Sequence, residues 1–183
     1  MNQELYRFFV ANYGRGRVVL VGTSDLIGEA IGVAQRSLTP DGEPSLWSHV
    51  FIFGEMRPDR RGPDSATGRN PYLFENDLHI DPLRVQVCNG AQENCIGKWC
   101  RDEVAHSAVL DFDLSQPEQD AVLGAALQLC DERLQYPILE LVGTWLAIIT
   151  ERVWAPNPFD DPHAMYCSVF ARYCYQQAGR VLG

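Results

Sequence analysis

Segments with strand character are grouped together in the chain, and this grouping restricts the fold more than any single motif. Branched and aromatic residues are concentrated in the segments 17–22, 47–53, 72–80, 83–87 and 104–112. Segments with apolar residues at helical spacing flank this group on both sides, and one interrupts it after its first member. Strands grouped in this way are typical of α+β proteins, so we predict a small antiparallel sheet packed with helices.

The expected helices cover residues 2–13, 26–38, 116–135 and 137–152, and another is expected within 163–178. Ser115 is a good N-cap residue for one of them, and Thr23, Ser24 and Asp25 can cap the helix that begins at residue 26. The helix after Asp25 is predicted to bury Leu26, Ile27, Ala30, Ile31 and Ala34. Residues 56–70 are predicted to form a loop and residues 88–102 an irregular segment. The length of 183 residues suits a single domain over residues 1–183.

The charge of the chain excludes some classes of partner. A formal net charge of −9 argues against a surface that binds nucleic acid or anionic membranes, since both require basic patches. The longest apolar run, 138–149, is interrupted by Glu140 and is shorter than a membrane helix, so we predict no stable membrane insertion. Glu4 and Arg7 interrupt the first ten residues, which predicts a cytoplasmic protein without a secretory signal, although a specialised export route stays open.

Cys167 is the candidate nucleophile because it stands where a helix is expected to begin. Asp160, Asp161 and Pro162 precede it and suit a helix entry. The partial positive charge at a helix N-terminus favours the thiolate, which is the nucleophilic form of cysteine. The alternative is a small buried side chain without a chemical role.

Two polar residues interrupt the apolar strands and could assist a thiol. His49 lies within the apolar strand 47–53, where an imidazole needs a partner. Glu75 follows two apolar residues in the next strand, and in an antiparallel pair the two side chains could meet. Asp77 and His79 point to the same face of that strand and remain alternatives to Glu75.

A nearer histidine is a second candidate for the base. His163 precedes Cys167 by four residues, a spacing that places both side chains on one face of a helix. A helix that begins so early would move Cys167 into its second turn, where the helix dipole acts less strongly.

Three cysteines and a histidine in the middle of the chain could bind zinc or form a disulfide. Cys88, Cys95, Cys100 and His106 are separated by six, four and five residues, which matches no common zinc motif. We therefore predict no metal and no cofactor, and both a metal site and a disulfide among these cysteines stay open as alternatives.

The order of these motifs resembles the circularly permuted NlpC-type cysteine hydrolases, which are papain-like proteins. The resemblance spans residues 17–178 and rests on Ser48-His49-Val50, Phe74-Glu75 and Tyr166-Cys167-Ser168. The YiiX-like group belongs to these proteins, and the permuted branch also contains lecithin retinol acyltransferase-like members. The resemblance implies a permuted papain-like fold in a single domain.

The resemblance also implies an acyl-transfer mechanism. Cys167 would be the nucleophile, His49 the base, and Glu75 the residue that orients His49. The implied substrate is a peptide or an acyl amide, for example a peptide linkage of the cell wall. The alternatives are a hydrolase or acyltransferase of lipid esters or amides, and a non-catalytic binding module with the same fold.

Overall fold

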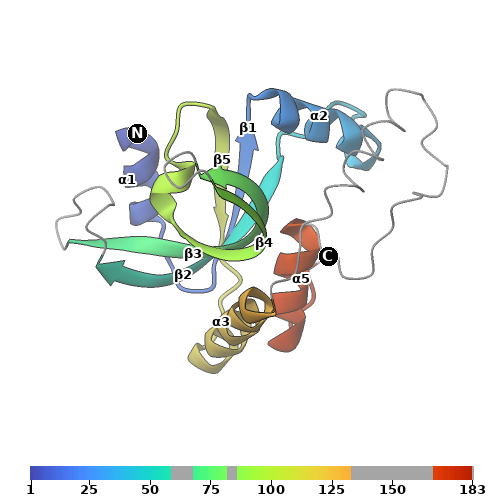
Figure 1. Cartoon of the computed structure of the whole chain (residues 1–183). Helices are drawn as coiled ribbons and strands as arrows, with labels where there is room; N and C mark the ends of the chain where they lie inside the picture. Colours follow the sequence, from blue (N-terminus) through green and yellow to red (C-terminus); the bar gives the residue numbers. More distant parts are fainter. Residues whose placement is uncertain (59–67, 82–85, 133–166, 183) are drawn as a thin grey trace.

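A five-stranded antiparallel sheet forms the centre of the protein (Figure 1). The computed structural model describes residues 1–58, 68–81, 86–132 and 167–182. The strands are β1 (Val18–Thr23), β2 (His49–Pro58), β3 (Arg69–Asp81), β4 (Gln86–Cys95) and β5 (Val104–Leu110), and they lie in the order β4-β3-β2-β1-β5. Helices pack against this sheet, which confirms the predicted α+β class.

Helices cover the sheet on both faces. The helical elements are α1 (Gln3–Ala11), α2 (Leu26–Ala34), η1 (Gln35–Leu38), η2 (Ile96–Trp99), α3 (Gln116–Asp131) and α5 (Cys167–Gln177). Val50 and Ile52 of β2 pack in one apolar cluster with α3 and α5, which lie side by side in Figure 1. Phe51 and Phe53 point to the opposite face and pack with α1 and η2. This division follows from the alternation of side chains along a strand.

Both helices begin with a cap from the predicted residues, and Asp25 is the one among Thr23, Ser24 and Asp25 that caps α2. The Asp25 side chain accepts a hydrogen bond from the backbone N–H of Gly28 at 2.8 Å, at the start of α2. Ser115 and Glu118 form a capping box at the start of α3. Helix α3 ends at Asp131, four residues before the predicted end at residue 135.

The predicted buried stripe of α2 is wrong for Leu26, Ile27 and Ala34, which are exposed, whereas Ala30 and Ile31 are half-buried. Leu26 is 83% exposed and Ile27 63% exposed, whereas the buried residues of this helix are Gly28 and Gly32. The helix packs closely because these glycines have no side chain: a Cβ atom at Gly32 would lie 2.6 Å from the carbonyl oxygen of Ser45. Hydrophobic periodicity does not detect a contact made by the absence of a side chain.

Two segments that were predicted to be irregular contain strands. β2 continues to Pro58 and β3 begins at Arg69, so both strands extend into the predicted loop. β4 runs to Cys95 and pairs with β3 from Tyr72↔Cys95 to Asp81↔Gln86. Most of this strand was not predicted because many of its residues are polar. Polar side chains are tolerated there because β4 is at the edge of the sheet.

No helix in the described residues is long and apolar enough to cross a membrane. The helix predicted at 137–152 and the residue His163 lie outside the described residues.

Candidate active site

Local backbone contacts fix His49 at the start of β2. Its partner in the β1 register is Val21, and the preceding Ser48 donates its backbone N–H to the carbonyl oxygen of Val21 at 2.9 Å. The Ser48 hydroxyl oxygen accepts a hydrogen bond from the backbone N–H of Thr23 at 3.1 Å. The imidazole of His49 is buried. These bonds to β1 hold the backbone on the N-terminal side of His49.

The carboxylate of Glu75 is fully buried in β3 and accepts four hydrogen bonds. Its Oε2 atom accepts from Nε2 of His49 at 2.9 Å and from Nε1 of Trp99 at 2.9 Å. Its Oε1 atom accepts from Nδ2 of Asn94 at 2.7 Å and from Nζ of Lys98 at 2.5 Å. Each oxygen therefore has two donors, which fixes the orientation of the carboxylate.

These contacts keep Glu75 ionised. Burial alone would raise the pKa of Glu75, but the Lys98 charge and the hydrogen bond from His49 lower it to about 2. An ionised carboxylate only accepts hydrogen bonds, so Nε2 of His49 carries a proton. The other ring nitrogen, Nδ1, is left to interact with Cys167.

Trp99 also fixes the plane of the imidazole. The rings of His49 and Trp99 are stacked, with centroids 4.7 Å apart and an interplanar angle of 20°. The same indole donates to Glu75, so one side chain holds both partners of the His49–Glu75 hydrogen bond. The ring of His49 consequently has little freedom to rotate.

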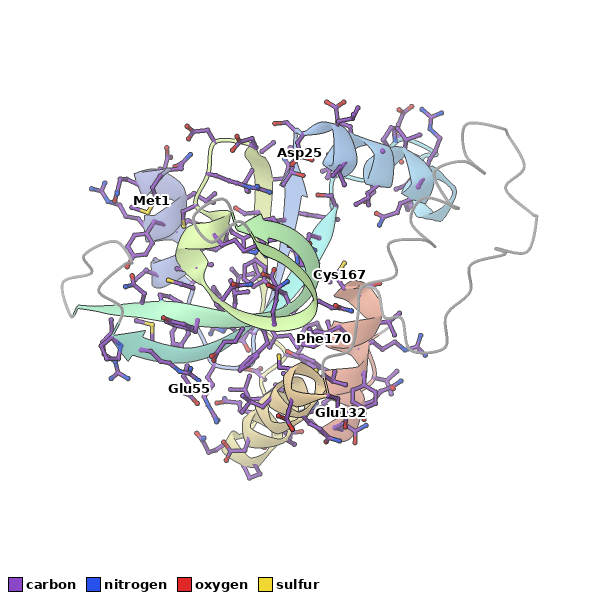
Figure 2. All side chains as sticks on the ribbon, in the orientation of Figure 1. Met1, Asp25, Glu55, Glu132, Cys167 and Phe170 are labelled. Atoms are coloured by element: carbon purple, nitrogen blue, oxygen red, sulfur yellow. The ribbon has the colours of Figure 1, made fainter. Side chains whose placement is uncertain are left out.

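Cys167 belongs to α5, which packs against β2 and β3 (Figure 2). Burial alone would raise the pKa of the Cys167 thiol, but the charge and the hydrogen bond of His49 and the backbone N–H of Val50 lower it. Burial alone would lower the pKa of His49, but Cys167 and Glu75 raise it to about 10. Both shifts favour a thiolate next to an imidazolium at neutral pH.

Other thiols of the protein have the opposite tendency. Burial is the main cause that raises the pKa of Cys100, Cys130 and Cys174 to about 12. These thiols remain protonated at neutral pH and are poor nucleophiles. Cys167 therefore differs from them by its histidine partner.

The alternative orienting residues are placed differently. Asp77 accepts a hydrogen bond from Nζ of Lys98 at 2.7 Å, whereas His49 bonds to Glu75. The side chain of His79 and the whole of His163 lie outside the described residues, so the structure does not compare them with Glu75 or His49.

The structure describes only some of the residues considered for zinc. Cys100 is a free thiol that donates a hydrogen bond to the carbonyl oxygen of Ile96 at 3.3 Å, and the side chain of Cys88 lies outside the described residues. His106 is exposed on β5. Among the described residues, no group of three or more histidine, cysteine or carboxylate side chains could hold a metal ion.

Three residues of the site were missed by the sequence analysis: Asn94, Lys98 and Trp99. They lie at the end of β4 and in η2, within the segment predicted to be irregular. A tryptophan next to a lysine in a polar segment was the available signal, because a tryptophan in such a segment usually packs against the protein. The sequence does not show that all three reach one carboxylate.

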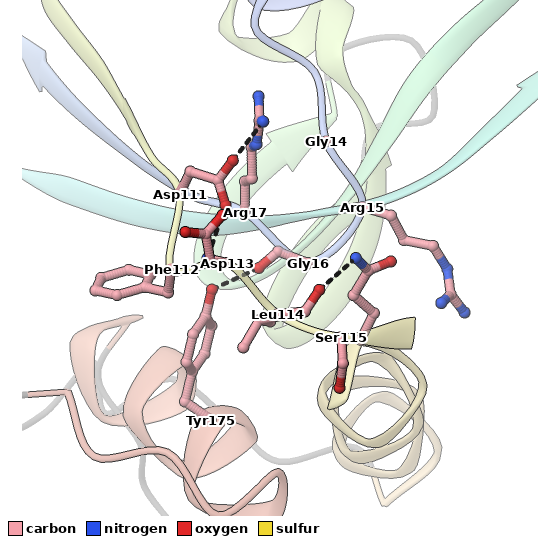
Figure 3. Close-up of a pocket in the computed structure, with 11 residues that line it drawn as sticks. Gly14, Arg15, Gly16, Arg17, Asp111, Phe112, Asp113, Leu114, Ser115 and Tyr175 are labelled. Carbon is pink, nitrogen blue, oxygen red and sulfur yellow. Dashed lines mark hydrogen bonds and ion pairs between the residues drawn. The ribbon is translucent and has the colours of Figure 1, made fainter. Parts of the chain in front are cut away.

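A cavity of about 380 Å³ lies elsewhere, where the loop Gly14–Arg17 meets the start of α3 and Tyr175 of α5 (Figure 3). Tyr175 follows Cys167 by eight residues, which corresponds to about 12 Å along a helix. The Tyr175 hydroxyl donates to the carbonyl oxygen of Gly16 at 2.6 Å, and Arg17 pairs with Asp111. The residues that line the cavity do not include Cys167, His49 or Glu75, so the cavity is not part of the candidate active site.

No protein-family model matches the chain, and no curated protein sequence matches it. The arrangement of Cys167, His49 and Glu75 is therefore the main indication of a function.

Proposed function

We propose that the protein is a cysteine hydrolase that cleaves an amide bond by acyl transfer. Cys167 is the nucleophile, His49 is the base, and Glu75 orients His49. The observation that carries this proposal is the hydrogen-bonded series Cys167–His49–Glu75, in which the pKa of the thiol is lowered while burial raises that of Cys130.

The proposed reaction cycle starts from the thiolate–imidazolium pair of Cys167 and His49. The Cys167 thiolate attacks the amide carbonyl, and backbone N–H groups near Cys167 stabilise the oxyanion. Nδ1–H of His49 then protonates the leaving amine as the C–N bond breaks, which leaves a thioester on Cys167. Neutral His49 next removes a proton from water, and the resulting hydroxide attacks the thioester. The acid product leaves, and the thiolate and imidazolium are restored.

Glu75 acts in this cycle without exchanging a proton. Both of its oxygens already accept two hydrogen bonds, and its pKa lies far below neutral pH. The carboxylate holds the His49 tautomer in which Nδ1 is the basic atom, and it stabilises the imidazolium once that forms.

The proposed substrate is a peptide or an acyl amide, and a peptide linkage of the cell wall is one such bond. A second candidate is the ester or amide of a lipid. The exposed apolar side chains of Leu26, Ile27 and Leu46 favour this candidate, because such side chains can contact an acyl chain. Leu46 precedes His49 by only three residues. Matched substrates that share an acyl group but differ in the length of its chain separate the two candidates.

Alkylation of individual cysteines tests the proposed nucleophile. We expect iodoacetamide to modify Cys167 near neutral pH much faster than Cys130, which is also partly exposed. In His49→Ala the rate at Cys167 should fall, by about tenfold for each unit that its pKa rises. Mass spectrometry of the digested protein measures both sites in one sample.

The same experiment has outcomes that contradict the proposal. Labelling of Cys167 no faster than that of Cys130 would mean that the thiol is inert, as in a binding module. His163→Ala is the matched control: a loss of reactivity in this variant, with His49→Ala unaffected, would show that His163 is the base.

A further inference from the structure

Lys98 is a largely buried cation that contacts Glu75, the residue that orients His49. Its side chain is 12% exposed, and its Nζ atom lies 2.5 Å from Oε1 of Glu75 and 2.7 Å from Oδ2 of Asp77. A buried ammonium group is costly unless it is paired, and here it bridges two carboxylates. The contacts are made from η2, an element that does not carry Cys167, His49 or Glu75.

Lys98 differs in charge from the other donors to Glu75. Asn94 and Trp99 are neutral donors, and His49 is charged only when it is protonated. Among the described residues, Lys98 is therefore the permanent cation on this carboxylate. Its removal would leave a buried carboxylate with neutral donors alone whenever His49 is neutral.

We propose that Lys98 is a positioning residue that keeps Glu75 ionised against His49 and thereby sets the lowest pH at which Cys167 is reactive. This role rests on the proposed function of Cys167. It acts through Glu75, because the contacts of Lys98 described above are with the carboxylates and not with the thiol.

The expected direction follows from the charges around the site. The titratable groups that face Glu75 and Lys98 are His49 from β2, Asp77 from β3, Cys130 from α3 and Cys167 from α5, and Glu93 of β4 lies near Cys130. Protonation of the thiolate at acidic pH changes the charge of the thiolate–imidazolium pair from zero to +1, so the loss of a nearby cation favours this protonation by a direct Coulomb effect. This effect has the same direction as the effect of Lys98 on the protonation of Glu75, with which Lys98 is in direct contact.

Protonation of Glu75 would disrupt the pair at acidic pH. Burial raises the pKa of this carboxyl group, and the Lys98 charge is the largest influence that lowers it. A protonated Glu75 would donate a hydrogen bond instead of only accepting, and it would not stabilise the imidazolium of His49. Removal of the Lys98 charge should therefore move the acid limit of Cys167 reactivity to higher pH.

The test measures the alkylation rate of Cys167 against pH in Lys98→Met, Lys98→Gln and Lys98→Arg. We expect the acid midpoint, measured against each variant's own plateau near neutral pH, to rise by about one pH unit in Lys98→Met, so that the alkylation rate below the midpoint is about tenfold lower relative to that plateau. Lys98→Arg should restore the wild-type midpoint. Lys98→Gln can still donate to Glu75 without a charge, so it tests the charge if Lys98→Met does not fold.

The outcomes separate this role from the proposed function. If wild-type Cys167 shows no reactivity that depends on His49, the proposed function fails. If the wild type is reactive but the folded neutral variants keep its acid midpoint, Lys98 is only a structural ion pair and the present inference is wrong.

Discussion

Replacement of Glu75 by glutamine removes one charge without changing the size of the side chain. The carboxylate accepts from His49 and Trp99 on one oxygen and from Asn94 and Lys98 on the other. A glutamine has one oxygen, so its NH2 group would face two donors in either orientation of the amide. If the NH2 group faces His49, the ring must accept at Nε2, so it can carry a proton only on the nitrogen next to Cys167.

The structure gives a magnitude for this change. A pKa that falls from 4.5 in the unfolded chain to about 2 in the folded protein corresponds to about 3 kcal/mol in the free energy of unfolding. Because the folded pKa is the lower one, this contribution is present above pH 4.5 and is lost as the pH falls toward 2. We expect Glu75→Gln to be about 3 kcal/mol less stable than the wild type at neutral pH, with a difference that shrinks in acid.

Urea unfolding of both proteins at a series of pH values, followed by far-UV circular dichroism, measures this difference. The two curves of unfolding free energy against pH should converge below pH 4.5. A difference that stays constant over this range would refute the reasoning. It would mean that the pKa of Glu75 is the same in the folded and in the unfolded protein.

Glu118→Gln is the matched control for this experiment. Hydrogen bonds from Arg180 and Ser115 also lower the pKa of Glu118 to about 2, but this group is at the surface. The stability difference of Glu118→Gln should therefore become smaller in high salt, whereas that of Glu75→Gln should persist.

Other predictions concern residues that support the site or the helices around it, and urea unfolding measures the change in stability that each substitution causes. Gly22→Ala should lower the free energy of unfolding by at least about 1–3 kcal/mol, because its Cβ atom would lie 1.8 Å from the carbonyl oxygen of Leu46. Gly124→Ala, whose Cβ atom would have nothing within 4 Å, should raise the free energy of unfolding by up to about 1 kcal/mol. An unaffected Gly22→Ala would show that the segment before His49 adjusts freely. Ser115→Ala removes the capping box and should lose about 1 kcal/mol without a change in the alkylation rate of Cys167. Trp99→Phe keeps a ring against the imidazole but loses the donor to Glu75, so it should lose about 1 kcal/mol and also slow this alkylation.

Local chemistry explains which parts of the fold could be predicted. The strands β1, β2 and β5 are rich in branched and aromatic residues, and Asp25 and Ser115 are strong helix caps. The histidine in β2 and the glutamate in β3 were unusual for their apolar surroundings, and the structure brings them into contact. Such features depend on a few neighbouring residues, so they can be read from the sequence.

The errors have a common physical cause. The contact of α2 with residue Ser45 is made by Gly32, and β4 pairs through its backbone although its side chains are polar. Neither interaction leaves a hydrophobic pattern in the sequence. Both depend on how closely two backbones approach, which is decided by the packing of the whole domain.

The sequence by itself determined the antiparallel sheet with its helices and singled out Cys167, His49 and Glu75 as residues that need partners. The sequence did not distinguish Asp77 from Glu75 as the partner of His49, because the alternation of side chains along a strand shows only which face of the sheet each one lies on. Tertiary structure decided between them: it directs Lys98 and Trp99 from η2 onto Glu75, and it pairs Asp77 with Lys98. The charge and hydrogen bonding of a buried carboxylate depend on donors that are distant in the chain, and only the folded protein brings them together.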